Sequence, residues 1–303
     1  MPRTTIQELL DAGVHFGHLR RKWNPAMAPY IFMEKEGIHI IDLQKTQAKL
    51  EEAATALKQI AKSGRKVLFV ATKKQAKDIV SEQVKKVNMP YVTERWPGGM
   101  LTNFPTIRKA VKKMSSIDKM ATDGTYDNMS KREKLQIARQ RAKLEKNLGS
   151  IVDLTRLPAA MFIVDIHKEH IAVHEARRLN IPIFAMVDTN SDPNLVDFPI
   201  PANDDASKSI SLILDLICKA MMEGLDERKM EREKDAEVSD KKSRKDDKAE
   251  DAEDPDEEFE ETREKRIAAR NALSLKAPAK KGVAIEIEEE EVEDTEEDVV
   301  LPD

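Results

Sequence analysis

The sequence predicts an α/β fold in which helices cover both faces of a doubly wound parallel sheet. Two continuous apolar runs, at 65–72 and 159–165, have the composition of strands that are buried on both faces. Each run leads into a helical pattern and then into another short strand, an alternation that is typical of βαβ units. An acidic segment follows at the C-terminus, so we divide the chain into a body at 1–230 and a tail at 231–303.

The N-terminal part of the body begins with a short helix signal that ends at Gly13. Residues 14–32 combine aromatic side chains, prolines and cations without a clean period, which indicates an ordered loop. A strand is expected at 38–43. The spacing of apolar residues over 44–64 then predicts a helix.

The alternation of strands and helices continues through the rest of the body. Strands are expected at 65–72, 89–93, 159–165, 181–188 and 198–202. Helices are expected at 73–88, 167–180 and 203–225. In such a sheet the carboxyl ends of the strands meet at one edge, where open α/β folds bind their ligands.

Residues 103–149 contain no strand signal and interrupt this alternation. Five apolar side chains recur there three or four positions apart and form one narrow stripe: Phe104, Ile107, Val111, Met114 and Ile117. A turn at 121–130 separates this helix from a second one. The segment from Pro105 to Leu148 carries 12 Lys+Arg against 5 Asp+Glu. We therefore expect an antiparallel, coiled-coil-like hairpin that protrudes from the sheet.

The distribution of charge distinguishes the body from the tail. Residues 231–303 hold 28 of the 56 Asp+Glu and 14 of the 51 Lys+Arg, which leaves 28 and 37 for residues 1–230. The formal charge is thus +9 for the body and −14 for the tail. A basic body favours a polyanionic partner such as nucleic acid. The tail has few large apolar side chains, so we expect it to be disordered.

The cysteine and hydropathy patterns indicate a cytosolic protein. The one cysteine, Cys218, lies on an apolar helical stripe, which suits a core position and a reducing compartment. No apolar run reaches the roughly 18 residues that a membrane span requires, and the N-terminus lacks the apolar core of a signal peptide. No membrane partner is expected.

The segment ERWPGGMLTN, at 94–103, has two interpretations. A strand, a glycine turn and a helix in sequence can cradle a phosphate. However, neither GxGxxG nor GxxxxGK[ST] occurs, and a tight turn that needs positive φ at Gly98 and Gly99 explains the glycines better. An enzyme that acts on a phosphorylated small molecule is thus the alternative function.

Two sets of side chains have the spacing of metal or acid–base sites. Three histidines stand three and four residues apart: His167, His170 and His174. They could bind zinc, although a solvated helix face explains them better because no cysteine accompanies them. Three aspartates follow strand ends: Asp165, Asp188 and Asp192. They could bind magnesium or transfer protons, but carboxylates at strand ends more often cap the following turn.

Cations, aromatic rings and turn residues gather in the loops and on the first hairpin helix. The candidate RNA-binding residues are His18, Arg20, Arg21, Lys22, Trp23, Asn24, Lys73, Lys74, Arg95, Trp96, Gly98, Gly99, Thr102, Asn103, Arg108 and Lys112. Lysine and arginine neutralise phosphates, whereas helix N-termini and glycine-turn amides add weaker anion contacts. Tryptophan and arginine planes can stack on unpaired bases. For any single cation, a solvated surface charge is the simpler explanation.

Five stretches, in this order, resemble small-subunit ribosomal protein S2 of the bacterial type. They read LLDAGVHFGHLRRKWNPAMAPYIF, ATKKQA, ERWPGGMLTNF, PAAMFIVDIHKEHIAVHEARRLNIP and AMVDTNSDPNLVDFPIPANDDASKSI. The resemblance runs from about Ile6 to Leu225. It implies a flavodoxin-like sheet with a protruding helical hairpin. It also implies a structural role, with no catalytic activity, cofactor or small-molecule substrate.

The resemblance implies particular partners as well. They are small-subunit rRNA, where the head of the subunit meets its body, and neighbouring proteins that include the large, mRNA-binding first protein of the subunit. The segment 94–103 is then expected to lie at the root of the hairpin, to grip RNA backbone and to fix the angle of the hairpin. The motifs do not extend to residues 231–303, and the acidic charge of this tail opposes direct binding to rRNA.

Overall fold

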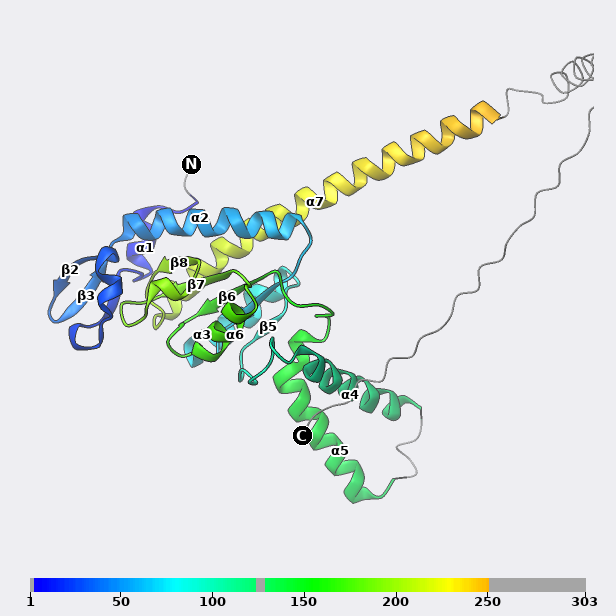
Figure 1. Cartoon of the computed structure of the whole chain (residues 1–303), viewed down its shortest axis with the longest axis horizontal. Coiled ribbons are helices and arrows are strands. Elements are labelled where there is room, and N and C mark those ends of the chain that lie inside the picture. The colour runs from blue at the N-terminus through cyan, green and yellow to red at the C-terminus, as the bar shows by residue number, and fades with distance from the viewer. Residues whose placement is uncertain (1–2, 124–128, 251–303) are drawn as a thin grey trace, which may run out of the picture. The chain divides into compact units, whose positions relative to one another are not determined.

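A computed structural model of the chain describes residues 3–123 and 129–250 (Figure 1). Contacts between residues divide the chain into two units, Met1–Glu237 and Val238–Asp303, and the α/β body lies in the first. Within the described residues, no helix is both long enough and apolar enough to cross a membrane.

The body contains the parallel sheet that the sequence predicts. Its five strands are β4 (Val67–Val70), β5 (Tyr91–Val92), β6 (Ala160–Val164), β7 (Ile183–Val187) and β8 (Phe198–Pro201). All neighbouring pairs are parallel, and their order across the sheet is β5-β4-β6-β7-β8. This is the 2-1-3-4-5 order of flavodoxin-like folds, in which the direction of winding reverses between β4 and β6.

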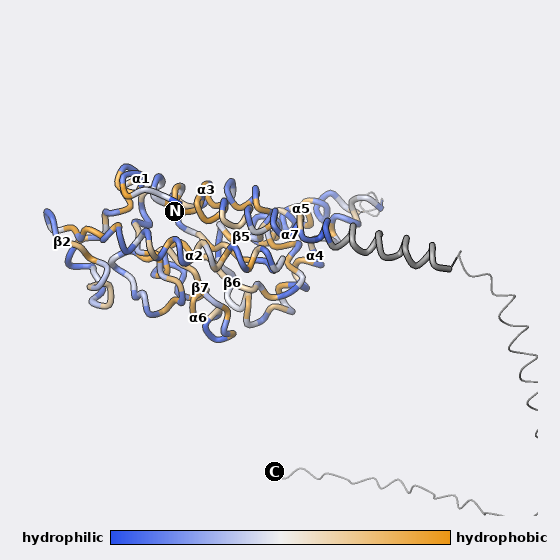
Figure 2. Tube along the Cα trace, turned by 90° about the horizontal axis from the view of Figure 1, so that it is seen from above, coloured by the Kyte–Doolittle hydropathy of each residue, from blue (hydrophilic) through white to orange (hydrophobic). Residues whose placement is uncertain are grey.

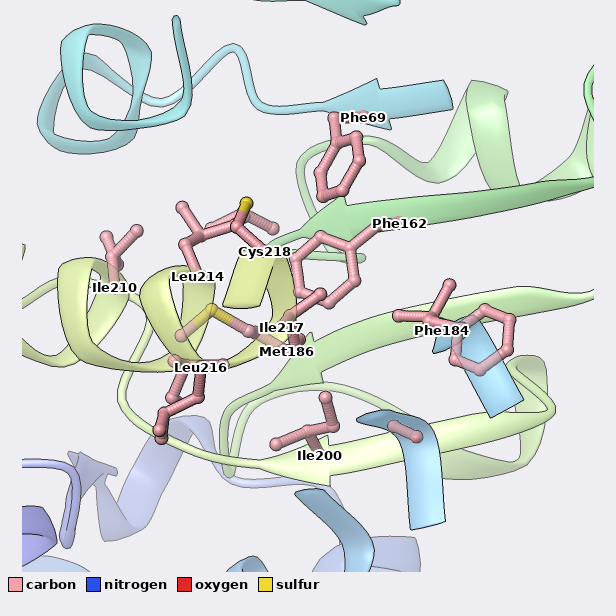
Figure 3. Packing of buried hydrophobic residues seen from close by; sticks show 14 of the residues in the cluster. Phe69, Phe162, Phe184, Met186, Ile200, Ile210, Leu214, Leu216, Ile217 and Cys218 are labelled. Carbon is pink, nitrogen blue, oxygen red and sulfur yellow. The ribbon is translucent and has the colours of Figure 1, made fainter. Parts of the chain in front are cut away.

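Apolar side chains from the strands alternate between two cores, as expected for a sheet covered on both faces. Phe69 belongs to the core under the helices α2 (Leu43–Lys62), α3 (Lys74–Lys86) and α7 (Ser207–Glu250). Figure 3 shows Phe69, Phe162 and Phe184, from three neighbouring strands, on the side of the sheet that α7 covers. The short helix α1 (Ile6–Asp11) adds Leu9 to this core.

The opposite face of the sheet has its own core. Leu68 and Val70 point into it from β4, and α6 (His170–Arg178) covers it with Ala172, Val173 and Ala176. The same core receives Trp96, Met100 and Leu101 from the segment that precedes the hairpin. The root of the hairpin is therefore packed directly on the sheet.

The N-terminal part of the body forms a second sheet, of which the sequence predicted only the strand at 38–43. It consists of β1 (Phe16–Leu19), β2 (Ile31–Lys35) and β3 (Ile38–Ile41), antiparallel in the order β1-β3-β2. Two 3-10 turns, Arg20–Lys22 and Pro25–Tyr30, lie between β1 and β2. The loop assignment at 14–32 was wrong for β1 and for the first two residues of β2. A strand is recognised by polar and apolar side chains that alternate along it. This alternation is hidden here because the pairing register is irregular and apolar side chains are exposed.

The hairpin helices are α4 (Phe104–Thr122) and α5 (Lys131–Leu148), which pack against each other (Figure 1). Val111, Met114 and Ile117 are buried, as the predicted apolar stripe requires. Both helices carry hydrophilic as well as hydrophobic residues (Figure 2). Most of the turn between them, at 124–128, lies outside the described residues.

Helix α7 corrects the expected boundary of the tail. We expected disorder from residue 231 onward, but α7 continues to Glu250. Residues 231–250 contain neither glycine nor proline, and lysine, arginine and glutamate, which favour helix, make up more than half of them. In addition, Lys62 of α2 pairs with Glu231 at 2.6 Å. The prediction for residues 251–303 falls outside the described part of the chain.

Candidate functional site

The carboxyl edge of the sheet holds a compact cluster of charged side chains around Lys73. The Lys73 Nζ atom lies 3.2 Å from Asp165, 2.8 Å from Asp204 and 2.7 Å from Asp205. Burial opposes the charge of Lys73, but the three carboxylates outweigh it and raise the lysine pKa above its ordinary value. Lys73 was predicted to contact phosphate; in the structure its charge is instead neutralised within the protein.

Strand β1 contributes His18 to the same edge. The Nδ1 atom lies 3.0 Å from Asp188, and Nε2 lies 3.3 Å from Asp205. The hydrogen bond with Asp188 raises the pKa of His18, and the neighbouring carboxylates add to this effect against the cost of burial. His18 thus joins the small sheet to the edge of the large one, a role different from the predicted RNA contact.

The same edge has a donor set that could hold a divalent cation. One ligand atom each from His18, Asp188 and Asp204 lies within 4.8 Å of the others. Burial raises the pKa of Asp204 to about 7, and the charges of Asp188 and Asp165 act in the same direction against Lys73. The weak zinc candidates His167, His170 and His174 are exposed and do not belong to this group.

The other carboxylates predicted at strand ends act mainly as caps. Asp192 accepts a hydrogen bond from the Asn194 amide at 2.9 Å and starts a 3-10 turn. Asp165 accepts one from the Lys168 amide at 3.1 Å. The structural interpretation of these aspartates is therefore confirmed, although Asp165 also pairs with Lys73.

The segment 94–103 binds a carboxylate of the protein itself. Glu175 of α6 is 8% exposed, and its Oε1 atom accepts hydrogen bonds from Trp96 Nε1 at 3.0 Å and from the Gly99 amide at 2.8 Å. Its Oε2 atom accepts from the Leu101 amide at 2.9 Å and from the amide and hydroxyl of Thr102 at 3.2 and 3.3 Å. Burial opposes ionisation of Glu175, but these hydrogen bonds outweigh it and hold its pKa below the ordinary value.

This arrangement changes the predicted roles of the segment. Trp96 is 7% exposed and packs in the core beside the hairpin root, so its ring is not presented for stacking on a base. Only Gly99 has the expected positive φ, of 80°. Gly98 does not, and a Cβ atom there would meet nothing within 4 Å. The backbone amides that could have bound a phosphate therefore bind the carboxylate of Glu175 instead.

Several other predicted residues have structural partners. Arg108 is partly buried and donates to the carbonyls of Val152 and Leu154 at 3.2 and 3.0 Å. The side chain of Asn24 accepts from the Ala26 amide at 2.9 Å and caps a 3-10 turn. Asn103 occupies the N-cap position of α4, where its side chain accepts from the Thr106 hydroxyl.

The remaining cations are exposed and form the candidate RNA-binding surface. Among the predicted residues these are Arg20, Arg21, Lys22, Lys74, Arg95 and Lys112. Arg20 makes one long ion pair, with Glu34 at 3.5 Å. Trp23 is half-exposed, and its ring centroid lies 5.1 Å from that of His39. Leu19, Arg20, Arg21, Trp23 and Gly37 together line a hollow of about 510 Å³.

Sequence reasoning missed the acidic residues that organise these sites. In the sequence Glu175 stands next to His174, and Asp204 and Asp205 stand at the start of the helix expected at 203–225. The available signal was their position, because Asp204 follows a strand that ends at the edge where Lys73 also lies. For Glu175 there was no local signal, since its partners are 73 to 79 residues away.

Comparison with known proteins identifies close relatives. The family model described as Ribosomal protein S2 matches residues 9–224. A small ribosomal subunit protein uS2 of Phocaeicola vulgatus is 73% identical over 232 residues, which cover 77% of this chain and 83% of the relative. Proteins of the same name are 69% identical in Porphyromonas gingivalis, with coverage of 77% and 83%, and 70% identical in Flavobacterium johnsoniae, with coverage of 76% and 91%.

Proposed function

The chain belongs to the ribosomal protein S2 family, and we propose that it binds small-subunit rRNA near the junction of head and body. Proteins of this family are structural and non-enzymatic, so the alternative of an enzyme acting on a phosphorylated small molecule is set aside. The close relatives are named as proteins of the small ribosomal subunit, and we assign the same structural role in translation to this chain.

The observation that carries the RNA-binding proposal is the cationic face of the hairpin. Lys109, Lys112 and Lys113 of α4 are exposed and lie three and four positions apart, which places them on one side of the helix. Arg132, Arg139 and Lys143 are exposed on α5. Rows of cations at this spacing suit the phosphates of an RNA backbone.

The small sheet supplies a second exposed surface. Arg21, Lys22 and the half-exposed Trp23 offer positive charge beside an aromatic face, a combination that suits unpaired nucleotides. Phe16 and Phe32, on β1 and β2, are 49% and 71% exposed. Apolar surface of this kind favours a protein neighbour. We propose that it helps to dock the large first protein of the small subunit.

The test of the RNA-binding proposal is the salt dependence of binding. In the full-length protein, Lys109, Lys112 and Lys113 are replaced together by alanine, and a control variant carries arginine at the same positions. The log–log slope of affinity for small-subunit rRNA against salt should become less steep by up to about 2.7 in the alanine variant, because each phosphate contact contributes about 0.9.

The arginine variant keeps the charge and should retain the wild-type slope. The same two variants are then tested for co-sedimentation with small subunits after a high-salt wash. Identical slopes for the wild-type protein and the alanine variant would show that the three lysines of the hairpin face do not contact RNA phosphates.

A further inference from the structure

Glu175 connects the core of the body to the entrance of the hairpin. Its carboxylate accepts all five hydrogen bonds from the segment 96–102. That segment leads into α4 without a spacer, since the Asn103 amide donates to the Gly99 carbonyl at 2.8 Å and α4 begins at Phe104. The backbone that surrounds Glu175 therefore leads directly into α4, whose base is also held by Val111 in the core and by Arg108.

The apolar anchors alone do not specify this backbone shape. Met100 and Leu101 are buried in the core, but apolar contacts are non-directional and tolerate a range of backbone rotations. The amides of Gly99, Leu101 and Thr102, by contrast, all turn inward toward one point. Without an anion at that point they would be left without partners, which is unfavourable in a partly buried site.

The length of the hairpin makes its departure angle important for binding. Helix α4 has 19 residues, which corresponds to roughly 28 Å at 1.5 Å per residue. A rotation of about 10° at its base would move the far end by about 5 Å, which is larger than the tolerance of a hydrogen bond or a phosphate contact. Cations along the hairpin can therefore match a fixed array of phosphates only if the base is held.

We propose that Glu175 is a positioning residue that holds the hairpin at the angle required for docking on structured rRNA. This inference rests on the proposed function. Glu175 itself is buried, so its carboxylate is not presented to a partner. It acts through the segment 96–102, and its effect is on recognition of the assembled RNA surface rather than on general attraction to phosphate.

The test compares Glu175→Gln with Glu169→Gln in the full-length protein. Glutamine at 175 replaces one carboxylate oxygen by an NH2 group, which then faces either the two donors at Oε1 or the three donors at Oε2. Glu169 is a matched control because it is also buried, at 4% exposed against 8% for Glu175, and directly precedes the same helix, but it accepts hydrogen bonds from Thr72 at the sheet edge. Trp96→Phe is a milder variant that removes one donor to Glu175 and keeps an aromatic ring.

Two measurements are made on each variant. Amide hydrogen exchange at Gly99, Leu101 and Thr102 should accelerate by about tenfold or more in Glu175→Gln, less in Trp96→Phe, and not in Glu169→Gln. Affinity is then measured for small subunits that lack this protein and for an unstructured homopolymer RNA. Glu175→Gln should bind the subunits at least about tenfold more weakly and the homopolymer as the wild type does.

The outcomes separate the inference from the function on which it rests. If Glu175→Gln accelerates exchange but binds the depleted subunits with wild-type affinity, the positioning role is refuted and the RNA-binding function stands. Equal losses for subunits and homopolymer would also refute it. If the wild-type protein itself binds depleted subunits no better than homopolymer, the result refutes the proposed RNA-binding function and not the positioning role alone.

Discussion

Replacing Gly99 by alanine should destabilise the body, whereas the same replacement at the adjacent Gly98 should not. Gly99 has φ +80°, and a Cβ atom there would lie 3.3 Å from the Cβ atom of Asn103. An L-residue in the left-handed region costs about 1–2 kcal/mol relative to glycine. Gly98 lies outside that region and has open space around it. Alanine there restricts mainly the unfolded chain and should stabilise by roughly 0.4–1 kcal/mol.

The pair is measured by urea unfolding of the full-length proteins, with thermal unfolding as a second measurement. For a body of this size, 1 kcal/mol corresponds to about 2–4 °C in Tm. Gly99→Ala should therefore lower Tm by about 2–8 °C at an unchanged slope of free energy against urea. A loss at Gly98 that equals or exceeds the loss at Gly99 would refute the assignment of the left-handed turn.

Two further predictions concern charge. Because the pKa of Asp204 is raised to about 7 in the folded protein, against about 3.9 in an unfolded chain, the folded state binds this proton more tightly. The contribution of Asp204 to the free energy of unfolding thus falls as pH rises from about 4 to about 7. The variant Asp204→Asn lacks this dependence. Its free energy of unfolding, relative to that of the wild type, should therefore increase by up to about 4 kcal/mol as pH rises between those limits. A difference that stays constant or decreases with pH would contradict the raised pKa of Asp204. Deleting residues 251–303 removes 20 Asp+Glu and 7 Lys+Arg, a net −13, and should raise affinity for unrelated RNA at low salt, with the gain disappearing as salt increases. Equal affinities of full-length and shortened protein at low salt would show that the tail does not compete with RNA.

The parts of the fold with a regular hydrophobic period could be predicted from the sequence. The runs that became β4, β6 and β7 are apolar throughout because both faces of those strands are buried. In the small sheet only β3, within the strand expected at 38–43, could be predicted in this way, and β1 and β2 could not. Gly17 has no side chain because a Cβ atom there would lie 2.6 Å from Thr189, and this requirement comes from a partner far along the chain.

The candidate site was less predictable than the fold because burial decides the role of a charged or aromatic residue. Lys73 and Lys74 are adjacent and chemically identical, yet Lys73 lies among three carboxylates and Lys74 is exposed. Trp23 and Trp96 both stand beside arginine or lysine in the sequence, and only Trp23 remains half-exposed. These differences depend on tertiary contacts between distant segments, which local spacing does not encode.

The docking of β1 on the sheet edge has a consequence for what this fold can accommodate. Flavodoxin-like proteins hold small ligands in the crevice where the winding direction reverses, beyond the carboxyl ends of the strands that here are β4 and β6. In this chain Lys73 follows β4 and pairs with Asp165 at the end of β6, while the amide of His18 donates to the Thr189 hydroxyl after β7. The crevice beyond β4 and β6 thus holds an ion-pair cluster of the protein itself, and the small sheet is docked beside it. Ligands that stabilise flavodoxin-like enzymes by filling this crevice would here have to displace the carboxylates that neutralise Lys73 before they could bind.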